Sequence, residues 1–281
     1  MALEKLDGQA AVVVGGGSGI GRGIALALAD EGMRVLVADI NVDGAASVRD
    51  EINKNGGEAF STRVDATSDE SLWEAAAEAE RTLGRVHLLV HTVGVISDTP
   101  VTTASDDDWA WYFDFNLMAA VRDVRAFLPL LRAHGEGGHI VVTASTAGVL
   151  SLPFSETGGI NIGAYTVAKH AMFAYGEVLG HELAPDGISV SVLCPGVVRT
   201  NLDETSARNR PVRFGGPLPT PKELDLPVRM EPEKVGRIVV KGIRANRRNI
   251  FTHHEMVEAV RARRIQPMLD DFAFFAENPT S

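Results

Sequence analysis

The sequence has almost no cysteine, no excess of positive charge and no long apolar run. Cys194 is the only cysteine among 281 residues, so no internal disulfide can form, and this usage fits a reducing, cytoplasmic compartment. Acidic residues outnumber basic ones by 37 to 27, which argues against nucleic-acid or anionic-membrane partners, since both are bound by clustered positive charge. Each hydrophobic stretch is interrupted by Gly, Asp or Arg before the roughly 20 residues that span a bilayer, and the N-terminus lacks the apolar core of a signal peptide.

Internal repeats and low-complexity tracts are also absent, and the order of the apolar segments predicts the fold. Short apolar runs alternate with longer stretches of helical period, which is typical of an α/β protein with a Rossmann-type, doubly wound parallel sheet. We expect a single domain over residues 1–281. The predicted strands are Ala10–Val14, Arg34–Asp39, Glu58–Arg63, Val86–His91, His139–Thr143, Ser189–Leu193 and Asn249–Thr252. The predicted helices are Ile20–Glu31, Gly44–Asn55, Asp69–Leu83, Asp106–Ala133, Ala164–Leu183 and Pro232–Ala245.

Two segments depart from this alternation. Residues 201–229 are rich in Pro and Gly, and a run of this length without structure is typical of a lid, a binding loop or a disordered linker. We interpret it as a substrate lid. A C-terminal extension over residues 254–281 carries arginines followed by an acidic stretch with several phenylalanines. It is expected to be partly helical, as a solvated helix end followed by a tail that packs on the body.

A glycine-rich turn, Gly15-Gly16-Gly17-Ser18-Gly19-Ile20-Gly21, directly follows the first predicted strand and opens an amphipathic helix. Glycine lets the backbone turn tightly and approach a pyrophosphate closely, while the free N–H groups at a helix start attract its negative charge. The position between a strand and a helix is the context that a dinucleotide-binding turn requires. The residues expected to contact the cofactor here are Gly15, Gly17, Ser18, Gly19, Ile20 and Gly21.

The second predicted strand ends at Asp39, 18 positions after Gly21. A carboxylate at this separation accepts hydrogen bonds from both hydroxyls of the adenosine ribose and repels a 2′-phosphate. No Arg or Lys follows in the next four residues, and Ser18 stands where a basic residue would reach that phosphate. The sequence therefore predicts NAD as the cofactor.

Tyr165 and Lys169 are four residues apart, a spacing that places both side chains on one face of a helix. A predicted strand running into Ser145-Thr146-Ala147-Gly148 precedes them, and Cys194-Pro195-Gly196-Val197-Val198-Arg199-Thr200 follows them. With the glycine-rich turn, these motifs resemble those of the short-chain dehydrogenase/reductase family, in the same order. The resemblance covers roughly residues 5–200 motif by motif and the remainder more loosely.

The resemblance implies an enzyme that moves a hydride between a nicotinamide cofactor and an alcohol or carbonyl substrate. It implies the catalytic residues Asn116, Ser145, Tyr165 and Lys169. It implies further cofactor contacts at Asp65, Ala66, Gly94, Tyr165, Lys169, Pro195, Gly196, Val198 and Thr200. It also implies a homodimer or homotetramer, formed through the helices predicted at 106–133 and 164–183.

The chemistry explains why these residue types are needed. A hydride leaves carbon only when the hydroxyl proton also departs, so a general base must lie within hydrogen-bond reach of the substrate oxygen. Tyr165 is expected to be this base, with its phenolate favoured by the neighbouring Lys169 ammonium and the charge of the nicotinamide. Lys169 would also bind the nicotinamide ribose, and Ser145 would donate to the substrate oxygen. Asn116 would support a water path to the lysine.

The chain departs from the family pattern at three places. Val14 stands where the family commonly has Thr before the first glycine, and His91-Thr92-Val93-Gly94 replaces Asn-Asn-Ala-Gly, so the bonds between these two loops are expected to differ. Ser145 lies 20 residues before Tyr165, a longer separation than usual, and we expect the extra residues in Pro153–Gly163 to bulge outwards. Ser151 is the competing serine, but its flanking sequence lacks the strand context.

The substrate is expected to be a fairly bulky, mostly apolar secondary alcohol or its ketone, because apolar residues flank Ser145 and Tyr165. These residues are Ala147, Val149, Leu150, Leu152, Phe154 and Ile162, with Val197 and Leu202 opposite. The arginines of the predicted lid, Arg208, Arg210 and Arg213, keep open the alternative of an acyl-chain reductase acting on 3-oxoacyl thioesters. A non-catalytic NAD-binding sensor is a second alternative. No metal site is expected, because His253-His254-Glu255 lacks further residues at ligand spacing.

Overall fold

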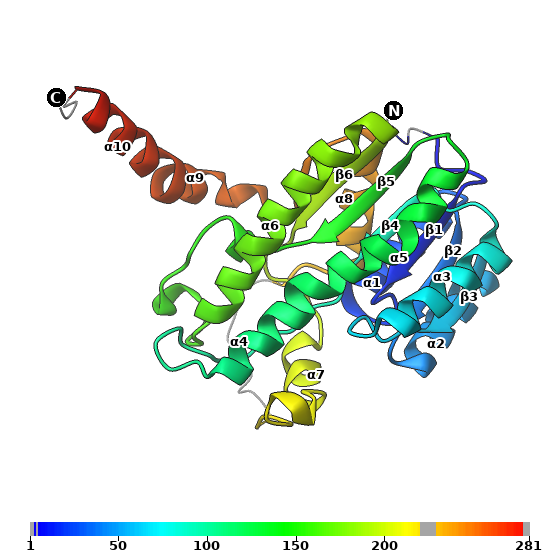
Figure 1. The fold of residues 1–281 in the computed structure, drawn as a ribbon, viewed down its shortest axis with the longest axis horizontal. Helices are drawn as coiled ribbons and strands as arrows, with labels where there is room; N and C mark the ends of the chain where they lie inside the picture. Colours follow the sequence, from blue (N-terminus) through cyan, green and yellow to red (C-terminus); the bar gives the residue numbers. More distant parts are fainter. Residues whose placement is uncertain (1–2, 4, 220–228, 278–281) are drawn as a thin grey trace.

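The computed structural model describes residues 3, 5–219 and 229–277, and seven parallel strands form one sheet within them. The strand order β3-β2-β1-β4-β5-β6-β7 confirms the doubly wound α/β fold, since the chain winds outwards in both directions from β1 (Figure 1). The strands are β1 (Ala10–Val14), β2 (Arg34–Asp39), β3 (Glu58–Arg63), β4 (Leu88–His91), β5 (Gly138–Thr143), β6 (Ile188–Cys194) and β7 (Asn249–Phe251). Val14 at the end of β1 pairs with Ala38 of β2 and His91 of β4, so the loops after these strands meet at one edge.

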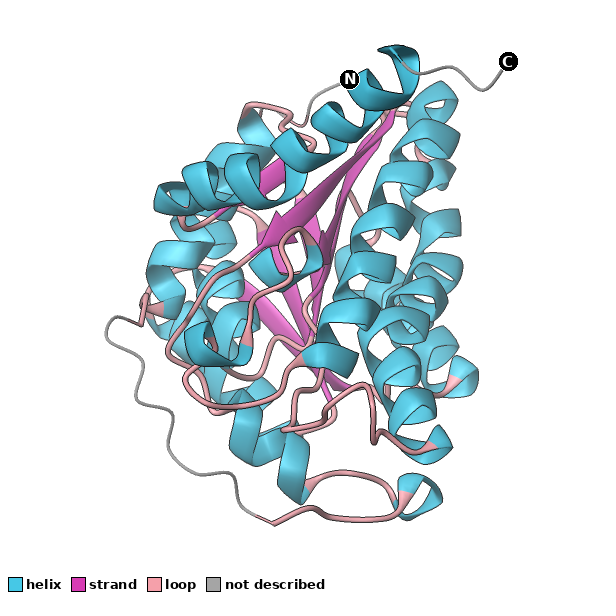
Figure 2. Cartoon of the chain, turned by 90° about the vertical axis from the view of Figure 1, so that its left-hand side faces the viewer, coloured by secondary structure: helices cyan, strands magenta, loops and turns pink. Residues whose placement is uncertain are grey.

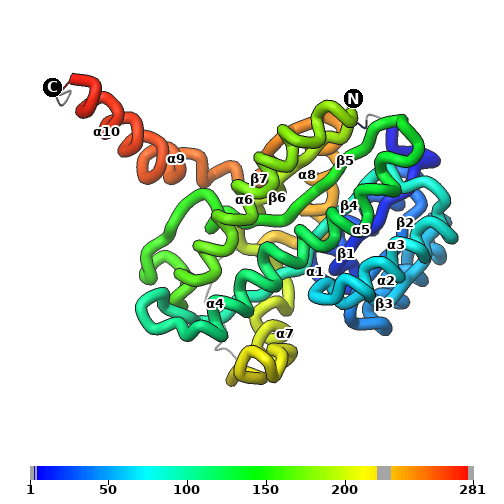
Figure 3. Tube along the Cα trace, in the orientation of Figure 1, coloured from blue at the N-terminus to red at the C-terminus, as the bar shows by residue number. Residues whose placement is uncertain are grey.

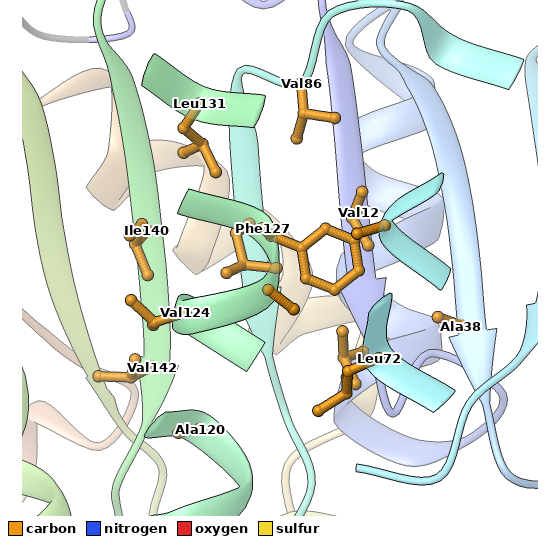
Figure 4. Close-up of a cluster of buried hydrophobic side chains, with 14 of the residues drawn as sticks. Val12, Ala38, Leu72, Val86, Ala120, Val124, Phe127, Leu131, Ile140 and Val142 are labelled. Carbon is orange, nitrogen blue, oxygen red and sulfur yellow. The ribbon is translucent and has the colours of Figure 1, made fainter. Parts of the chain in front are cut away.

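Helices cover both faces of the sheet (Figure 2). One layer contains α1 (Gly19–Asp30), α2 (Val42–Lys54) and α8 (Pro232–Arg244), and the other contains α3 (Asp69–Leu83), α5 (Ala119–Ala133) and α6 (Gly163–Leu183). The central strands β1, β4 and β5 are buried along their whole length on both faces, as the near-continuous apolar runs predict. Phe127 of α5, fully buried, lies beside Leu72 of α3 and Val12 of β1 (Figure 4).

The long helix predicted over 106–133 is interrupted. It consists of α4 (Asp106–Phe113), a π-helical turn (Asp114–Met118) and α5. π-helical turns inside α-helices often occur at functional sites, and this one contains Asn116, whose side chain is fully buried.

The segment predicted as an unstructured lid is partly ordered. It contains α7 (Leu202–Arg208) and a 3₁₀ turn at Val212–Phe214, while residues 220–228 of the predicted lid lie outside the described residues. The expectation of a structureless run was therefore wrong for its first half. The cause is packing: Ser206 and Ala207 are buried, and the Ser206 hydroxyl accepts a hydrogen bond from the backbone N–H of Ile96 at 3.1 Å.

The C-terminal extension is helical, as α9 (Val257–Val260), a π-helical turn (Arg261–Ile265) and α10 (Gln266–Glu277). It projects from the body as an arm (Figure 3), and every residue from 261 to 277 is exposed. The prediction that this tail packs on the body was wrong for residues 265–277; residues 278–281 lie outside the described part. None of the described helices is both long enough and apolar enough to span a membrane.

Candidate active site

The glycine-rich turn is held open by backbone geometry that only glycine tolerates. Gly15 and Gly19 have φ angles of 82° and 50°, a region that other residues rarely adopt. A Cβ on Gly21 would overlap the carbonyl oxygen of Gly15, and one on Gly17 would lie 2.9 Å from a carboxylate oxygen of Asp39. Ser18 is the N-cap residue of α1, yet its side chain makes no capping hydrogen bond. The first N–H groups of α1 therefore remain free of a side-chain cap and can receive an anion.

Asp39 lies at the carboxyl end of β2, directly across from this turn. One carboxylate oxygen accepts a hydrogen bond from the N–H of Gly17 at 2.8 Å, and the other accepts from the N–H of Asn41 at 2.8 Å. These bonds fix the carboxylate beside the turn, and each oxygen keeps a lone pair for a further donor.

The loop after β4 is joined to the glycine-rich turn by the hydroxyl of Thr92. Position 14, where the family commonly has Thr, is Val in this chain. Thr92 Oγ1 lies 2.9 Å from the carbonyl oxygen of Val14 and 3.0 Å from that of Gly15, and donates to them. The sequence predicted that the bonds between these two loops would differ, and in the structure the hydroxyl comes from the loop after β4. His91, where the family commonly has Asn, is fully buried, and its Nδ1 lies 2.6 Å from Asp123 of α5.

Asn116 and Gly94 lie against the same loop. Asn116 accepts from the N–H of Val95 and donates to its carbonyl, both at 3.0 Å, so the π-helical turn is tied to the strand-end loop. A Cβ on Gly94 would lie 2.8 Å from Asn116 Oδ1 and 3.2 Å from Lys169 Nζ. A side chain at position 94 would therefore push against the Asn116 amide first and crowd the lysine.

Tyr165, Lys169 and Ser145 meet between α6 and the end of β5. Lys169 Nζ donates to the carbonyl of Thr143 at 3.0 Å and lies 5.7 Å from the centre of the Tyr165 ring. Ser145 is hydrogen-bonded to Tyr165 and also accepts from the N–H of Ala147 at 3.1 Å. All three side chains are buried, whereas the competing Ser151 is exposed. Ser145 is the serine that can share a substrate oxygen with Tyr165.

Burial dominates the electrostatics of this group. It raises the pKa of Tyr165 to about 12, although the hydrogen bond with Ser145 opposes this shift. It lowers the pKa of Lys169 to about 7. The sequence predicted that the Lys169 ammonium favours the phenolate, but in the protein alone the desolvation of Tyr165 is the larger effect. Burial also raises the pKa of the Cys194 thiol to about 12, which fits its interpretation as a buried strand residue.

The residues 9–211 match the family model described as short chain dehydrogenase, which covers more than half of the chain. The chain belongs to the short-chain dehydrogenase/reductase family. Over 200 residues it is 34% identical to a cyclohexanol dehydrogenase of Acinetobacter sp. (strain SE19), covering 71% of this chain and 76% of that protein. It is 31% identical to the 7alpha-hydroxysteroid dehydrogenase of Escherichia coli (strain K12) over 197 residues, covering 70% and 74%.

Solved structures agree with this assignment. A short-chain dehydrogenase/reductase from Burkholderia phymatum, in complex with NAD, superposes with a TM-score of 0.84 at 31% identity, covering 95% of this chain and 96% of that chain. Members of this family are oxidoreductases that bind a nicotinamide cofactor and act on hydroxyl groups of small molecules. The glycine turn fits such a cofactor, because the start of α1 has no side-chain cap and Asp39 is fixed beside the turn.

The remaining residues predicted to contact the cofactor lie around the same edge of the sheet. One oxygen of Asp65 is engaged by Thr67, whose N–H and hydroxyl donate to it at 2.9 and 2.7 Å, and the adjacent Ala66 is buried. The methyl group of Thr200 lies close to Gly19 of the turn. The carbonyl of Pro195 accepts from the N–H of Thr146 at 2.8 Å, which joins the Pro195-Gly196 turn to the serine segment.

This family member surrounds Tyr165 with an apolar cluster drawn from distant segments. The buried members are Val95, Trp111, Tyr112, Ala147, Ala164, Tyr165, Ala168 and Phe214, and the partly buried members are Ile96, Trp109, Phe115, Ile162 and Leu218. Of the apolar residues suggested by the sequence, Ala147 and Ile162 belong to it, whereas Phe154 points into solvent with 54% exposure. Sequence reasoning missed Trp111, Tyr112 and Phe214, because no local pattern brings α4 and the lid onto α6.

The lid arginines are engaged by carboxylates of this chain. Arg210 is buried, pairs with Asp108 at 2.7 Å and stacks over the Trp111 ring at 4.8 Å. Arg213 lies 3.2 Å from Asp114 and also donates to Thr67. Arg208 is exposed and lies 3.4 Å from Glu204. The sequence pattern gave no sign that Arg210 fastens the lid to α4.

One cluster of potential metal ligands lies at the opposite edge of the sheet among the described residues. His87, His134 and Glu136 bring ligand atoms within 4.8 Å of one another. However, His87 Nδ1 accepts from the N–H of Ala10, and His134 Nδ1 accepts from the N–H of Glu136, both at 3.2 Å. The imidazoles are therefore used as structural hydrogen-bond acceptors. His253, noted in the sequence, accepts from the N–H of Gly196 at 3.1 Å.

Proposed function

We propose that this chain is an NAD(H)-dependent dehydrogenase that interconverts a fairly bulky, mostly apolar secondary alcohol and its ketone. The observation that carries the substrate class is the apolar cluster around Tyr165, which offers hydrophobic contact. Two relatives whose names specify a cyclohexanol and a hydroxysteroid, both cyclic secondary alcohols, support the same class.

The proposed chemistry assigns one role to each buried polar side chain. Ser145 donates to the substrate oxygen, and Tyr165 takes the hydroxyl proton during oxidation or returns it during reduction. Lys169 binds the nicotinamide ribose. Together with Asn116 it also forms the path by which this proton reaches solvent. The bound nicotinamide supplies or accepts the hydride. Because burial raises the pKa of Tyr165 to about 12, its hydroxyl stays protonated unless a nearby positive charge stabilises the phenolate.

The preference for NAD is proposed from Asp39. Both of its oxygens are fixed beside the glycine turn, so a 2′-phosphate would be repelled by this carboxylate. In addition, none of the four residues after Asp39 is basic. We expect the native chain to use NAD(H) in preference to NADP(H). Asp39→Ala should weaken NAD binding about 10-fold, because hydrogen bonds to the ribose are lost, and it should reduce the preference for NAD over NADP. Cofactor dissociation constants measured by fluorescence test this, and a native preference for NADPH would refute it.

The acyl-chain reductase remains the second candidate, because arginines in the lid could bind a carboxylate or phosphate. The structure gives each of these arginines a carboxylate of its own chain, which favours the apolar substrate. Steady-state kcat/KM for 1-arylalkanols, cyclic alcohols and 3-hydroxyacyl thioesters, each with NAD and NADP, separates the candidates. A preference for the thioester that disappears in the Arg208→Ala, Arg210→Ala, Arg213→Ala variant would overturn the proposal. Absence of turnover with the whole panel would favour a non-catalytic sensor.

We further propose that residues 1–281 act as one catalytic domain in the cytoplasm and as a homodimer or homotetramer. The exposed side of α6 supports assembly, because Val167 and Val178 are 43% and 53% exposed there. The single buried cysteine supports a reducing compartment.

A further inference from the structure

The C-terminal arm, defined as residues 257–277, carries an apolar surface that the described body does not cover. Ile265, Met268, Leu269, Phe272 and Phe275 are 46–72% exposed. A single isolated helix of this length is marginally stable in water, since most helical stability in proteins comes from packing of an apolar face. The arm therefore needs a partner both to cover these side chains and to hold its own helix.

Four of the exposed apolar side chains form one seam that begins at Ile265 and continues along α10, whereas Phe274, 58% exposed, lies off it. The spacing of Ile265, Met268, Phe272 and Phe275 is three, four and three residues, which keeps them on one side of the helix. Asp270 and Glu277 lie on the opposite side by the same periodicity. One seam of this spacing is suited to one long partner helix, because a second helix can follow it along its length.

The charges differ between the two ends of the arm. The end near the body carries Arg261, Arg263 and Arg264, and the far end carries Asp270, Asp271 and Glu277. Arg264 and Asp271 are seven residues apart, so they flank the seam on the same side. When two identical helices pair in antiparallel orientation, these flanking positions of one helix face those of the other, and Arg264 then meets Asp271.

The beginning of the arm is fixed to the body. Arg263 forms an ion pair with Glu156 at 2.7 Å, and Arg264 lies 3.2 Å from His170 of α6. Figure 1 shows the arm leaving the body beside α6 and extending away from it. The far end is thus presented at a defined place, where a second arm can approach.

We propose that the arm is a self-association surface, on which the arm of a second copy of this chain lies antiparallel with the two seams in contact. The opposite charges of the two ends select this orientation. A fully covered phenylalanine side chain buries roughly 150–250 Å², so the two rings and two aliphatic side chains of the seam supply part of the ~800 Å² per partner of a stable interface. The proposal is independent of the substrate and of the cofactor preference.

A single charge in the seam tests the interface in the full chain. We expect Phe272→Glu to halve the molar mass measured by light scattering after size exclusion at micromolar concentration. Ala273→Glu is the matched control, because it adds the same carboxylate to an exposed residue beside the seam, and it should leave the mass unchanged. An unchanged mass for Phe272→Glu, or an equal loss in both variants, would overturn the proposal. A monomeric native chain would also overturn it.

A charge exchange tests the antiparallel orientation. Arg264→Glu or Asp271→Arg alone should weaken self-association at least 10-fold in sedimentation equilibrium, because like charges then face one another. The double variant restores opposite charges and should recover most of the lost affinity. Failure of the double variant to recover affinity would exclude the antiparallel pairing. The melting temperature of each variant, measured in parallel, distinguishes a lost interface from an unfolded body.

Discussion

The cofactor side and the substrate side of this site are built from different materials. The cofactor side consists mostly of backbone, namely glycines with positive φ angles and the start of α1, together with one side-chain carboxylate at the end of β2. The substrate side consists of side chains, brought onto Tyr165 from α4, the serine segment and the lid. Backbone geometry is imposed by a few neighbouring residues and tolerates little change, whereas a cluster of side chains can be repacked. On the proposed function, the backbone side would set the choice of cofactor, and the side-chain cluster would set which alcohol is accepted.

The largest expected effect separates chemistry from cofactor binding. Tyr165→Phe removes only the hydroxyl that carries the proton, so kcat should fall by roughly 10²–10⁴ while the dissociation constant for NADH stays within about twofold. Stopped-flow or steady-state absorbance of the nicotinamide measures the first quantity, and fluorescence titration measures the second. Turnover above a few per cent of the native value would remove Tyr165 from its proposed role.

The reverse separation is expected on the cofactor side. Gly21→Ala places a Cβ against the carbonyl oxygen of Gly15, so the turn must shift and cofactor affinity should fall by about 10²-fold or more. Gly180→Ala in α6 is the matched control, because its Cβ would meet only Val190 at 3.5 Å, an ordinary contact. The control should keep native affinity and a native or slightly raised melting temperature. Equal affinity in both variants would contradict a backbone-built cofactor site.

A smaller effect is expected from loosening the lid. Arg210→Met leaves Asp108 without its partner and removes the charge over the Trp111 ring, so KM for a bulky alcohol should rise about 10-fold with unchanged NADH affinity. The unfolding free energy should fall by roughly 2 kcal/mol, since the pair is largely buried. Arg208→Met, which removes an exposed arginine, should change neither value measurably. A rise of KM in both variants would show that the Arg210–Asp108 pair is not the cause of the effect.

The smallest effect concerns the lysine between the two sides. Burial lowers the pKa of Lys169 from 10.5 to about 7 in the folded chain, so the folded state binds fewer protons than the unfolded state between these values. Stability should therefore rise with pH across this window, and the cost of burying the lysine is fully present below it. Lys169→Met should be more stable than the native chain by about 2 kcal/mol near pH 6, and this gain should fade towards about pH 10. Thermal melts at both pH values measure this difference, with Lys5→Met, at an exposed position, as the control. If Lys169→Met showed no pH-dependent gain over the native chain, Lys169 would be an ordinarily solvated lysine.

The same contrast explains how far the sequence could predict this protein. The strands, the glycine turn and the helix that carries Tyr165 follow from local spacing, and the structure has them within a few residues of the predicted bounds. The interruption of the helix at Asp114–Met118 was not predictable, because it depends on bonds from Asn116 to Val95 in another segment. The fastening of the lid by Arg210 depends on Asp108, about 100 residues away, in the same manner.

The hydroxyl of Thr92 shows what is retained when the residues of a motif change. A donor between the loops after β1 and β4 is present here, but it belongs to the second loop and points towards the first. Grafting the first loop alone from a relative with Thr before its first glycine would bring two hydroxyls together, and grafting the second loop alone would leave Val14 opposite an amide in place of the hydroxyl. The two loops therefore form one exchangeable part, and chimaeras of this chain should transfer them as a pair.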